Sequence, residues 1–322
     1  MIRRIPGCVW RALQLAMALG LLALLWQAAD GPDAARRLAN ADWGPLLLAL
    51  LALTMQTVLS AVRWQVTARQ LGIFFGAGHA VREYYLAQVV NQSLPGGMIG
   101  DAGRAYRARA QAGLMASGQS VVIERLAGQV VMFAALAVGF FATFAAPGGL
   151  DWPRALAVPV AAALAAGCAL PAVLWAATRL RGVLGKAAAR LWRLLDRTML
   201  DKRILPYQVA LGIGTTLCNL AAFAFCARAV GIDLSVGAVM ALVPLILFTM
   251  LIPISVSGWG LREGAAAALL PLAGASASSG LAASVAFGLT FIVAVLPGVI
   301  FLRIDPKRRD RARRDRPPRK AD

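Results

Sequence analysis

The sequence predicts an all-α polytopic membrane protein, in which six transmembrane helices and two re-entrant hairpins form an inverted-topology repeat. Three observations carry this prediction: long apolar blocks, the placement of the basic residues, and a helix-breaking motif that occurs twice. Of the 322 residues, 59% are hydrophobic and only 15% are charged, and the mean hydropathy is +0.68. This composition excludes an ordinary soluble domain.

Six apolar blocks supply the predicted transmembrane helices, since each approaches the roughly 20 residues that a helix needs to cross a bilayer. The blocks run over about 9–28, 43–64, 120–145, 156–177, 206–230 and 281–302. The first block follows Arg3 and Arg4 and therefore also resembles a cleaved signal peptide. Trp10 and Trp26 bracket it like the aromatic anchors of a membrane interface, so we expect a retained helix.

The basic residues determine the predicted orientation of these helices. Lys and Arg are concentrated before the first block, in 63–82, in 178–205 and after residue 302, whereas the other connections carry few. Because cytoplasmic loops of membrane proteins are rich in Lys and Arg, both termini are expected to be cytoplasmic. We attribute the net charge of +18 to this topology and expect no nucleic-acid partner.

Two stretches do not fit a single crossing. Residues 83–112 begin and end on the cytoplasmic side, and residues 236–276 begin and end on the opposite side. Each contains the helix-breaking motif: Leu94–Arg104 reads LPGGMIGDAGR and Ile252–Arg262 reads IPISVSGWGLR, with Pro, Gly and Arg in register. Both stretches are predicted to be re-entrant hairpins, because irregular backbone at membrane depth is tolerated where protein or water covers it. The alternative is eight spans, with a seventh at 236–252 and a short eighth at 262–276.

The spans and hairpins divide the chain into two halves with the same plan. Residues 1–145 hold two helices, a hairpin and a helix, and residues 146–302 repeat that order. An odd number of crossings in each half inverts the second half relative to the first, as in many transporters. The linker 178–205 is predicted to form a basic amphipathic helix on the cytoplasmic surface, and 303–322 a disordered basic cytoplasmic tail.

Charged and polar groups within apolar segments are costly unless they are paired or hydrated, so they mark a candidate site. Arg104 and Arg262 close the two motifs, and Asp101 lies three residues before Arg104, a spacing that allows a pair on one helical turn. The expected substrate-binding residues are Asn91, Asp101, Arg104, Glu124, Arg125, Ser255, Ser257, Arg262 and Glu263. Guanidinium groups and the helix N-termini after Gly100 and Gly260 suit a phosphate. The competing interpretation is that these charges form structural pairs that hold the hairpins in place.

Motifs that would indicate catalysis are missing from the sequence. It contains no Gly-Lys-Ser/Thr nucleotide loop, no Gly-x-Ser-x-Gly elbow and no His-Glu-x-x-His pair. The cysteines, which lack the spacing of metal ligands, are Cys8, Cys168, Cys218 and Cys226. The single histidine, His79, lies in a predicted loop. We therefore expect no catalytic residue, no metal and no cofactor.

The order of the motifs resembles the transmembrane module of the lysylphosphatidylglycerol synthases and of their free-standing, flippase-like relatives. The resemblance covers about 10–302 and rests on Asn91, Leu94-Pro95-Gly96-Gly97, Gly100-Asp101, Arg104, Glu124-Arg125-Leu126, Pro253, Ser255, Gly258 and Gly260-Leu261-Arg262-Glu263. It implies a bacterial inner-membrane location and movement of a lipid between leaflets. The chain departs from the family in two respects: no aminoacyl-transferase domain follows the last helix, and Gly128 stands where an acidic residue often follows the Glu-Arg pair.

These observations predict a lipid translocase that moves a phospholipid, or another lipid with a polar headgroup, between the leaflets. Its partners would be membrane lipids with phosphate headgroups. The alternative is a non-transporting membrane subunit that binds a lipid-linked sugar or assists a glycosyltransferase, with a lipid-modifying enzyme as its partner. A transporter of small solutes is a third and less favoured interpretation.

Overall fold

The structure, a computed structural model, describes residues 7–93, 98–145, 149–252 and 257–303. Over these ranges the chain consists of helices and their connections, without a β-strand. The helices that are long and apolar enough to cross a membrane are α3 (Trp43–Gln70), α5 (Ile99–Ala145), α6 (Arg154–Ala177), α8 (Leu205–Ala229) and the segment Ala277–Phe301. The all-α, membrane-spanning class is therefore confirmed. The predicted six crossings with two re-entrant hairpins stay a prediction.

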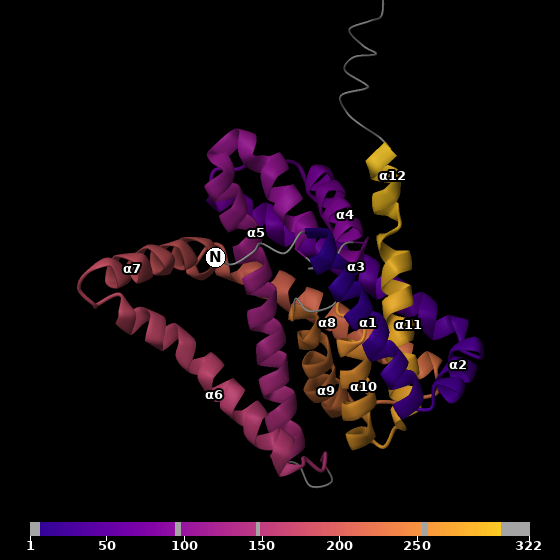
Figure 1. The fold of residues 1–322 in the computed structure, drawn as a ribbon. Helices are drawn as coiled ribbons and strands as arrows, with labels where there is room; N and C mark the ends of the chain where they lie inside the picture. Colours follow the sequence, from indigo (N-terminus) through magenta and orange to yellow (C-terminus); the bar gives the residue numbers. More distant parts are fainter. Residues whose placement is uncertain (1–6, 94–97, 146–148, 253–256, 304–322) are drawn as a thin grey trace, which may run out of the picture.

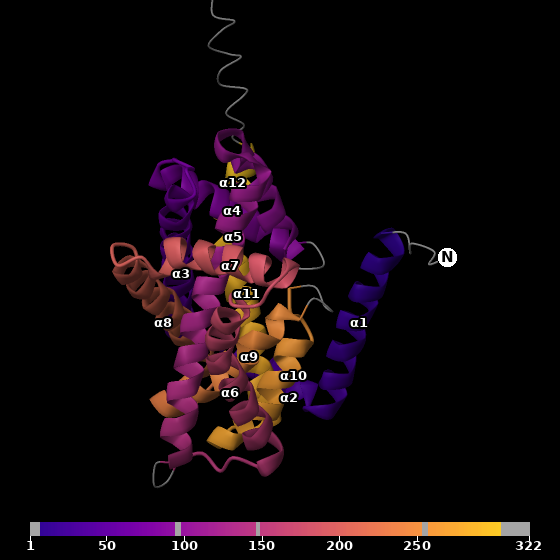
Figure 2. The ribbon, with the colours of Figure 1, turned by 90° about the vertical axis from the view of Figure 1, so that its left-hand side faces the viewer.

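The N-terminal region contributes two helices. Helix α1 (Gly7–Ala28) has 22 residues and occupies the first predicted block, although it is not among the five candidate spans. It contacts α2 (Gly31–Ala39) and α10, and Figure 2 shows it at the side of the bundle. Helix α2 begins after Asp30, whose carboxylate accepts the backbone N–H of Asp33 at 3.2 Å. This capping bond satisfies an amide that the first turn of a helix leaves without an intrahelical partner.

The first predicted hairpin corresponds to two helical segments that pack against each other. These are α4 (Ala77–Ser93) and the first arm of α5, residues 99–112. Helix α5 breaks at Gly113, where φ is 80° and ψ is 168°, a backbone conformation that favours glycine. The break adjoins residue 112, where the sequence predicted the hairpin to end. The motif tip, residues 94–97, lies outside the described residues.

The second predicted hairpin also corresponds to two short helical segments. Helix α9 (Val236–Phe248) is extended by the 3₁₀ turn η2 (Thr249–Leu251), and α10 (Leu261–Leu269) is followed by η3 (Leu270–Ala273). Both segments are shorter than the roughly 20 residues that a crossing needs. Their length favours a hairpin over the alternative of a seventh and an eighth span. The motif tip, residues 253–256, lies outside the described residues.

The bundle brings the two halves of the chain together. Helix α3 packs along α8, and α11 (Ala277–Val295) contacts α3, α8 and α10, with the rings of Phe223 and Phe287 5.5 Å apart in the shared core. In Figures 1 and 2, α4 and α12 (Pro297–Arg303) lie toward the upper end of the bundle, and α9 and α10 toward the lower end. The two predicted hairpins therefore occupy opposite ends of the molecule.

The predicted linker contains the helix α7 (Val183–Leu195), which continues into the π-helical turn η1 (Asp196–Leu200). Figure 1 shows α7 away from the centre of the bundle, between α6 and α8. Large apolar side chains of α7 are exposed, including those of Val183, Leu184 and Leu191. Exposed apolar groups beside basic ones fit the predicted surface helix, whose contact with lipid stays a prediction. The predicted tail beyond Arg303 lies outside the described residues.

Candidate functional site

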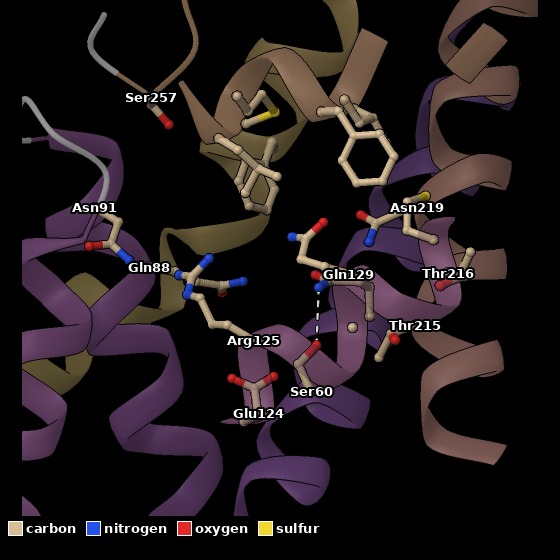
Figure 3. A pocket seen from close by; sticks show the side chains of 18 of the residues that line it. Ser60, Gln88, Asn91, Glu124, Arg125, Gln129, Thr215, Thr216, Asn219 and Ser257 are labelled. Atoms are coloured by element: carbon tan, nitrogen blue, oxygen red, sulfur yellow. Dashed lines mark hydrogen bonds between the residues drawn. The ribbon is translucent and has the colours of Figure 1, made fainter. Parts of the chain in front are cut away.

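A polar cavity of about 230 Å³ lies between the two halves of the chain (Figure 3). Helices α3, α4 and α5 line it from the first half, and α8, α9, η2 and α11 line it from the second. Its polar lining comprises Gln56, Ser60, Arg63, Tyr84, Gln88, Asn91, Gln92, Glu124, Arg125, Gln129, Thr215, Thr216, Asn219 and Ser257. Its apolar lining comprises Met132, Leu247, Phe248, Met250, Leu251, Phe287 and Phe291. The cavity therefore has a polar lining from both halves and an apolar lining that comes mainly from α9, η2 and α11.

An arginine–carboxylate cluster, formed by Arg63, Asp101, Arg104, Glu124 and Arg125, adjoins this cavity. Arg63 donates to Glu124 Oε1 at 2.8 Å. Arg104 donates to Asp101 Oδ1 at 3.0 Å and to Glu124 Oε2 at 3.3 Å. Arg125 forms an ion pair with Asp101 Oδ2. Three guanidinium groups thus face two carboxylates, which leaves one formal positive charge in excess.

Both carboxylates of the cluster also accept hydrogen bonds from neutral protein donors. Besides the arginines, Asn91 Nδ2 donates to Asp101 Oδ2 at 3.0 Å, and the Tyr84 hydroxyl donates to Glu124 Oε1 at 3.3 Å. Every oxygen of Asp101 and Glu124 therefore accepts at least one hydrogen bond. A molecule that enters the cavity meets guanidinium groups, neutral polar groups and the carboxylate of Glu124, which is already paired with two arginines.

Arg125 is the most accessible charge of the cluster. Its side chain is 36% exposed, whereas that of Arg63 is 5% exposed and that of Arg104 is completely buried. Figure 3 shows Arg125 directed into the cavity, with Asn219 on the opposite side. Arg125 and Arg63 both line the cavity, so theirs are the guanidinium groups of the cluster that face it.

Arg104 lies behind the cavity wall and does not line the cavity. Its guanidinium carbon is 4.5 Å from the ring centroids of both Trp64 and Tyr84, an arrangement that favours a buried cation. The sequence placed Arg104 in direct contact with substrate. In the structure its contacts are Asp101, Glu124 and the two rings, so Arg104 positions the carboxylates that hold Arg63 and Arg125.

Arg262 and Glu263 form a second buried pair, also away from the cavity lining. Arg262 Nη2 lies 2.5 Å from Glu263 Oε1, and Arg262 Nε donates to Ser284 Oγ at 3.0 Å. Glu263 Oε2 accepts the backbone N–H of Gly260 at 2.6 Å. These bonds cap the start of α10 and join it to α11. The contacts of this pair match the structural interpretation of the sequence more closely than the substrate-binding one.

Asn91 and Ser257 both line the cavity, as a binding role requires. Asn91 Oδ1 also accepts the backbone N–H of Gly100 at 2.7 Å. The amides of Gly100 and Gly260 are therefore occupied by side chains and are not open to a ligand. Ser257 Oγ donates to Gln92 Oε1, which connects the start of the second hairpin's returning arm to the end of α4. Ser255 lies outside the described residues.

Arg63, which links the cluster to the second half, was not among the residues predicted from the sequence. Arg63 Nη1 donates to Thr215 Oγ1 on α8 at 2.9 Å. A Cβ atom added at Gly128 would lie 2.7 Å from Arg63 Nη2, so the glycine leaves room for this guanidinium. The signal was present in the sequence, because Arg63 interrupts an apolar block. It was assigned to a basic loop, whereas α3 continues to Gln70.

The described residues offer no other obvious kind of site. Within 7–93, 98–145, 149–252 and 257–303, no group of three His, Cys, Asp or Glu side chains could hold a metal ion. A second, open pocket at the α2–α8 end is lined by exposed charges that include Arg36, Asp42 and Arg228. The cavity between the halves is therefore the candidate site.

The fold and this cavity together define a polytopic membrane protein with a buried, arginine-lined polar site. The chain belongs to the family described as the lysylphosphatidylglycerol synthase TM region, whose model matches residues 11–298. This match confirms the resemblance seen in the sequence motifs and links the chain to membrane lipids. A comparison with curated proteins gave no match.

Proposed function

We propose that this protein is a lipid translocase, which moves a phospholipid or another lipid with a polar headgroup between the leaflets of a bacterial inner membrane. The observation that carries the proposal is the cavity, which both halves of the chain line and which adjoins a net positive cluster. Burying such a cluster is costly, so its presence in a membrane protein supports a role in binding an anion. The family's link to a phospholipid synthase supports the lipid as the source of that anion.

In this proposal the headgroup enters the cavity and the acyl chains stay in the bilayer. Arg125 and Arg63 bind the phosphate, because a guanidinium recognises phosphate oxygens through two parallel hydrogen bonds. The cavity of about 230 Å³ is smaller than the roughly 300–1,000 Å³ of pockets that enclose drug-sized ligands. It has room for a headgroup and not for a complete lipid. The apolar lining residues of α9 and η2 suit the start of the acyl chains.

Alternating access would come from rocking one half of the chain against the other. Two contacts between the halves lie at the cavity, Arg63 with Thr215 and Gln92 with Ser257. Both are single hydrogen bonds, which a headgroup phosphate can replace when it binds the same donors. Transport of this kind needs no bond making or breaking, so we propose no enzymatic activity for the chain.

The test is leaflet-resolved lipid translocation in vesicles that contain the purified protein and phosphatidylglycerol. Arg125→Gln is expected to slow translocation by about tenfold or more, since a hydrogen-bonded contact with a charged group is worth roughly 1.5–3 kcal/mol. The matched control is Arg109→Gln on the same helix, whose guanidinium lies 3.4 Å over the Tyr106 ring and does not line the cavity. This control should leave the rate unchanged.

Two results would contradict the proposal. One is a rate in wild-type vesicles that does not exceed the rate in protein-free vesicles. The other is a folded Arg125→Gln variant that moves lipid at the wild-type rate. Lipid binding without any translocation would support the alternative function, a membrane subunit that presents a lipid to a partner enzyme.

A further inference from the structure

One wall of the cavity carries hydrogen-bonding groups that have no partner. This amide wall consists of Gln129 on α5 and of Thr216 and Asn219 on α8, all of which line the cavity. Within the part of the chain that the structure describes, none of these three side chains forms a hydrogen bond. Figure 3 shows Asn219 on the side of the cavity opposite Arg125, with Gln129 between them. The hydroxyl of Thr216 lines the cavity, where it can form a hydrogen bond with a polar ligand.

The amide wall is uncharged and offers both donors and acceptors. Each amide side chain can donate two hydrogen bonds and accept two, and the hydroxyl can donate one and accept two. Such a set matches the hydroxyl groups of glycerol or of a sugar. Gln129 follows Arg125 by four residues on α5, so the two side chains lie on the same helix face. A group held by the wall is therefore adjacent to a phosphate held by Arg125.

Among the described residues, the cavity offers an ammonium group no carboxylate that is free of an arginine partner. The oxygens of Asp101 and Glu124 accept hydrogen bonds from the protein, as do those of Glu263 beyond the lining. The excess positive charge of the arginine–carboxylate cluster also repels a cation. An amine-bearing headgroup would lose its water without gaining a carboxylate in return, which is unfavourable.

From these observations we infer that the transported lipid carries one phosphate and an uncharged, hydroxyl-rich headgroup, of the glycerol or sugar-alcohol kind. Arg125 and Arg63 bind the phosphate, and the amide wall binds the hydroxyl groups. The single excess charge of the cluster matches the single charge of a phosphodiester. This inference rests on the proposed function, because it specifies the lipid that the translocase moves.

The test compares headgroups in vesicles that contain wild-type protein and a trace of one acyl-labelled lipid. The panel is phosphatidylglycerol, phosphatidylinositol, phosphatidylethanolamine, lysylphosphatidylglycerol and phosphatidic acid. We expect phosphatidylglycerol and phosphatidylinositol to move at least about fivefold faster than phosphatidylethanolamine and lysylphosphatidylglycerol. One net hydrogen bond contributes a factor of about this size. Equal or faster movement of the amine-bearing lipids would overturn the inference while leaving the translocase proposal intact. Movement of no lipid would overturn both.

Variants of the amide wall provide a second measurement. Gln129→Leu and Asn219→Leu are each expected to slow phosphatidylglycerol about fivefold and to leave phosphatidic acid, which lacks the hydroxyl-bearing group, at the wild-type rate. The phosphatidic acid rate also reports whether each variant is folded. Gln129→Glu keeps the size of the side chain and adds an acceptor for an ammonium, so it should shift the preference toward lysylphosphatidylglycerol. An unchanged order of rates in all three variants would overturn the role of the wall.

Discussion

The buried carboxylate of Glu124 gives the sharpest test of the arginine–carboxylate cluster. It is completely buried and accepts hydrogen bonds from Arg63, Arg104 and Tyr84. In Glu124→Gln, the amide keeps one acceptor oxygen and replaces the other by an N–H donor. The donor then faces a guanidinium donor, so either Arg63 or Arg104 loses its bond to residue 124. The formal charge of the cluster rises from one to two.

The expected cost follows from the charges that remain. Removing one partner of a buried ion pair destabilises a protein by about 3–5 kcal/mol, because the other charge stays buried without compensation. Combining Glu124→Gln with Arg63→Gln returns the cluster to one excess charge, with Arg104 and Arg125 facing Asp101. The double variant should therefore be more stable than the sum of the two single effects predicts, by roughly 0.5–3 kcal/mol.

Thermal and denaturant unfolding of detergent-solubilised protein, followed by tryptophan fluorescence, measures these differences. The matched control is Asp233→Asn, whose carboxylate is 87% exposed and 3.5 Å from Arg228. This control should leave the unfolding temperature unchanged, since exposed ion pairs contribute little. Strictly additive effects of Glu124→Gln and Arg63→Gln would refute the coupling. A Glu124→Gln protein as stable as the wild type would refute the buried pair itself.

Two further predictions concern the frame around the site. A Cβ atom at Gly100 would lie 2.0 Å from a backbone oxygen of α4, whereas at Gly103 it would meet only the end of a flexible side chain at 3.1 Å. Gly100→Ala should therefore lower both the unfolding temperature and the rate of lipid translocation, whereas Gly103→Ala should change neither. Equal effects of the two substitutions would contradict the close packing at Gly100. Outside the spans, hydrogen bonds from Arg37 and then from Ser278 hold the pKa of Asp33 below its ordinary value of 3.8. The ionised carboxylate is stabilised only in the folded state. The wild type should therefore be more stable than Asp33→Asn at neutral pH, and this advantage should disappear as the pH falls below about 4. Unfolding curves across this pH range measure the advantage, and an advantage that grows on acidification would contradict the prediction.

Much of the fold was predictable because its signals are local or compositional. Hydropathy and the charges of the loops located the long helices, since the bilayer imposes both. Proline and glycine in the motif Leu94–Arg104 located the end of α4 and the start of α5, because these residues interrupt helices. The pair of Asp101 and Arg104 also followed from sequence, since a spacing of three residues brings two side chains together on one turn.

The rest of the site depends on contacts that no local spacing encodes. Arg63 is 61 residues from Glu124 and 152 residues from Thr215, so only the packing of α3 against α5 and α8 brings them together. The amide wall was missed for a related reason. A glutamine or an asparagine in an apolar helix either lines a cavity or forms a hydrogen bond with another helix, and the neighbouring sequence is the same in both cases. The distinction appears only when the partners of each side chain are known.

The repeated motif identifies equivalent positions in the two halves, and the structure shows that equivalent positions carry different chemistry. Arg104 and Arg262 are both buried beside aromatic rings and both hold the first turns of a hairpin's returning arm. Arg104, however, shares its carboxylates with Arg63 and Arg125, whereas Arg262 pairs with the adjacent Glu263 and neutralises it. The charge at the cavity therefore comes from the first half, and the free neutral groups of α8 come from the second. A headgroup with a phosphate at one end and hydroxyl groups at the other fits this asymmetry, and a headgroup charged at both ends does not.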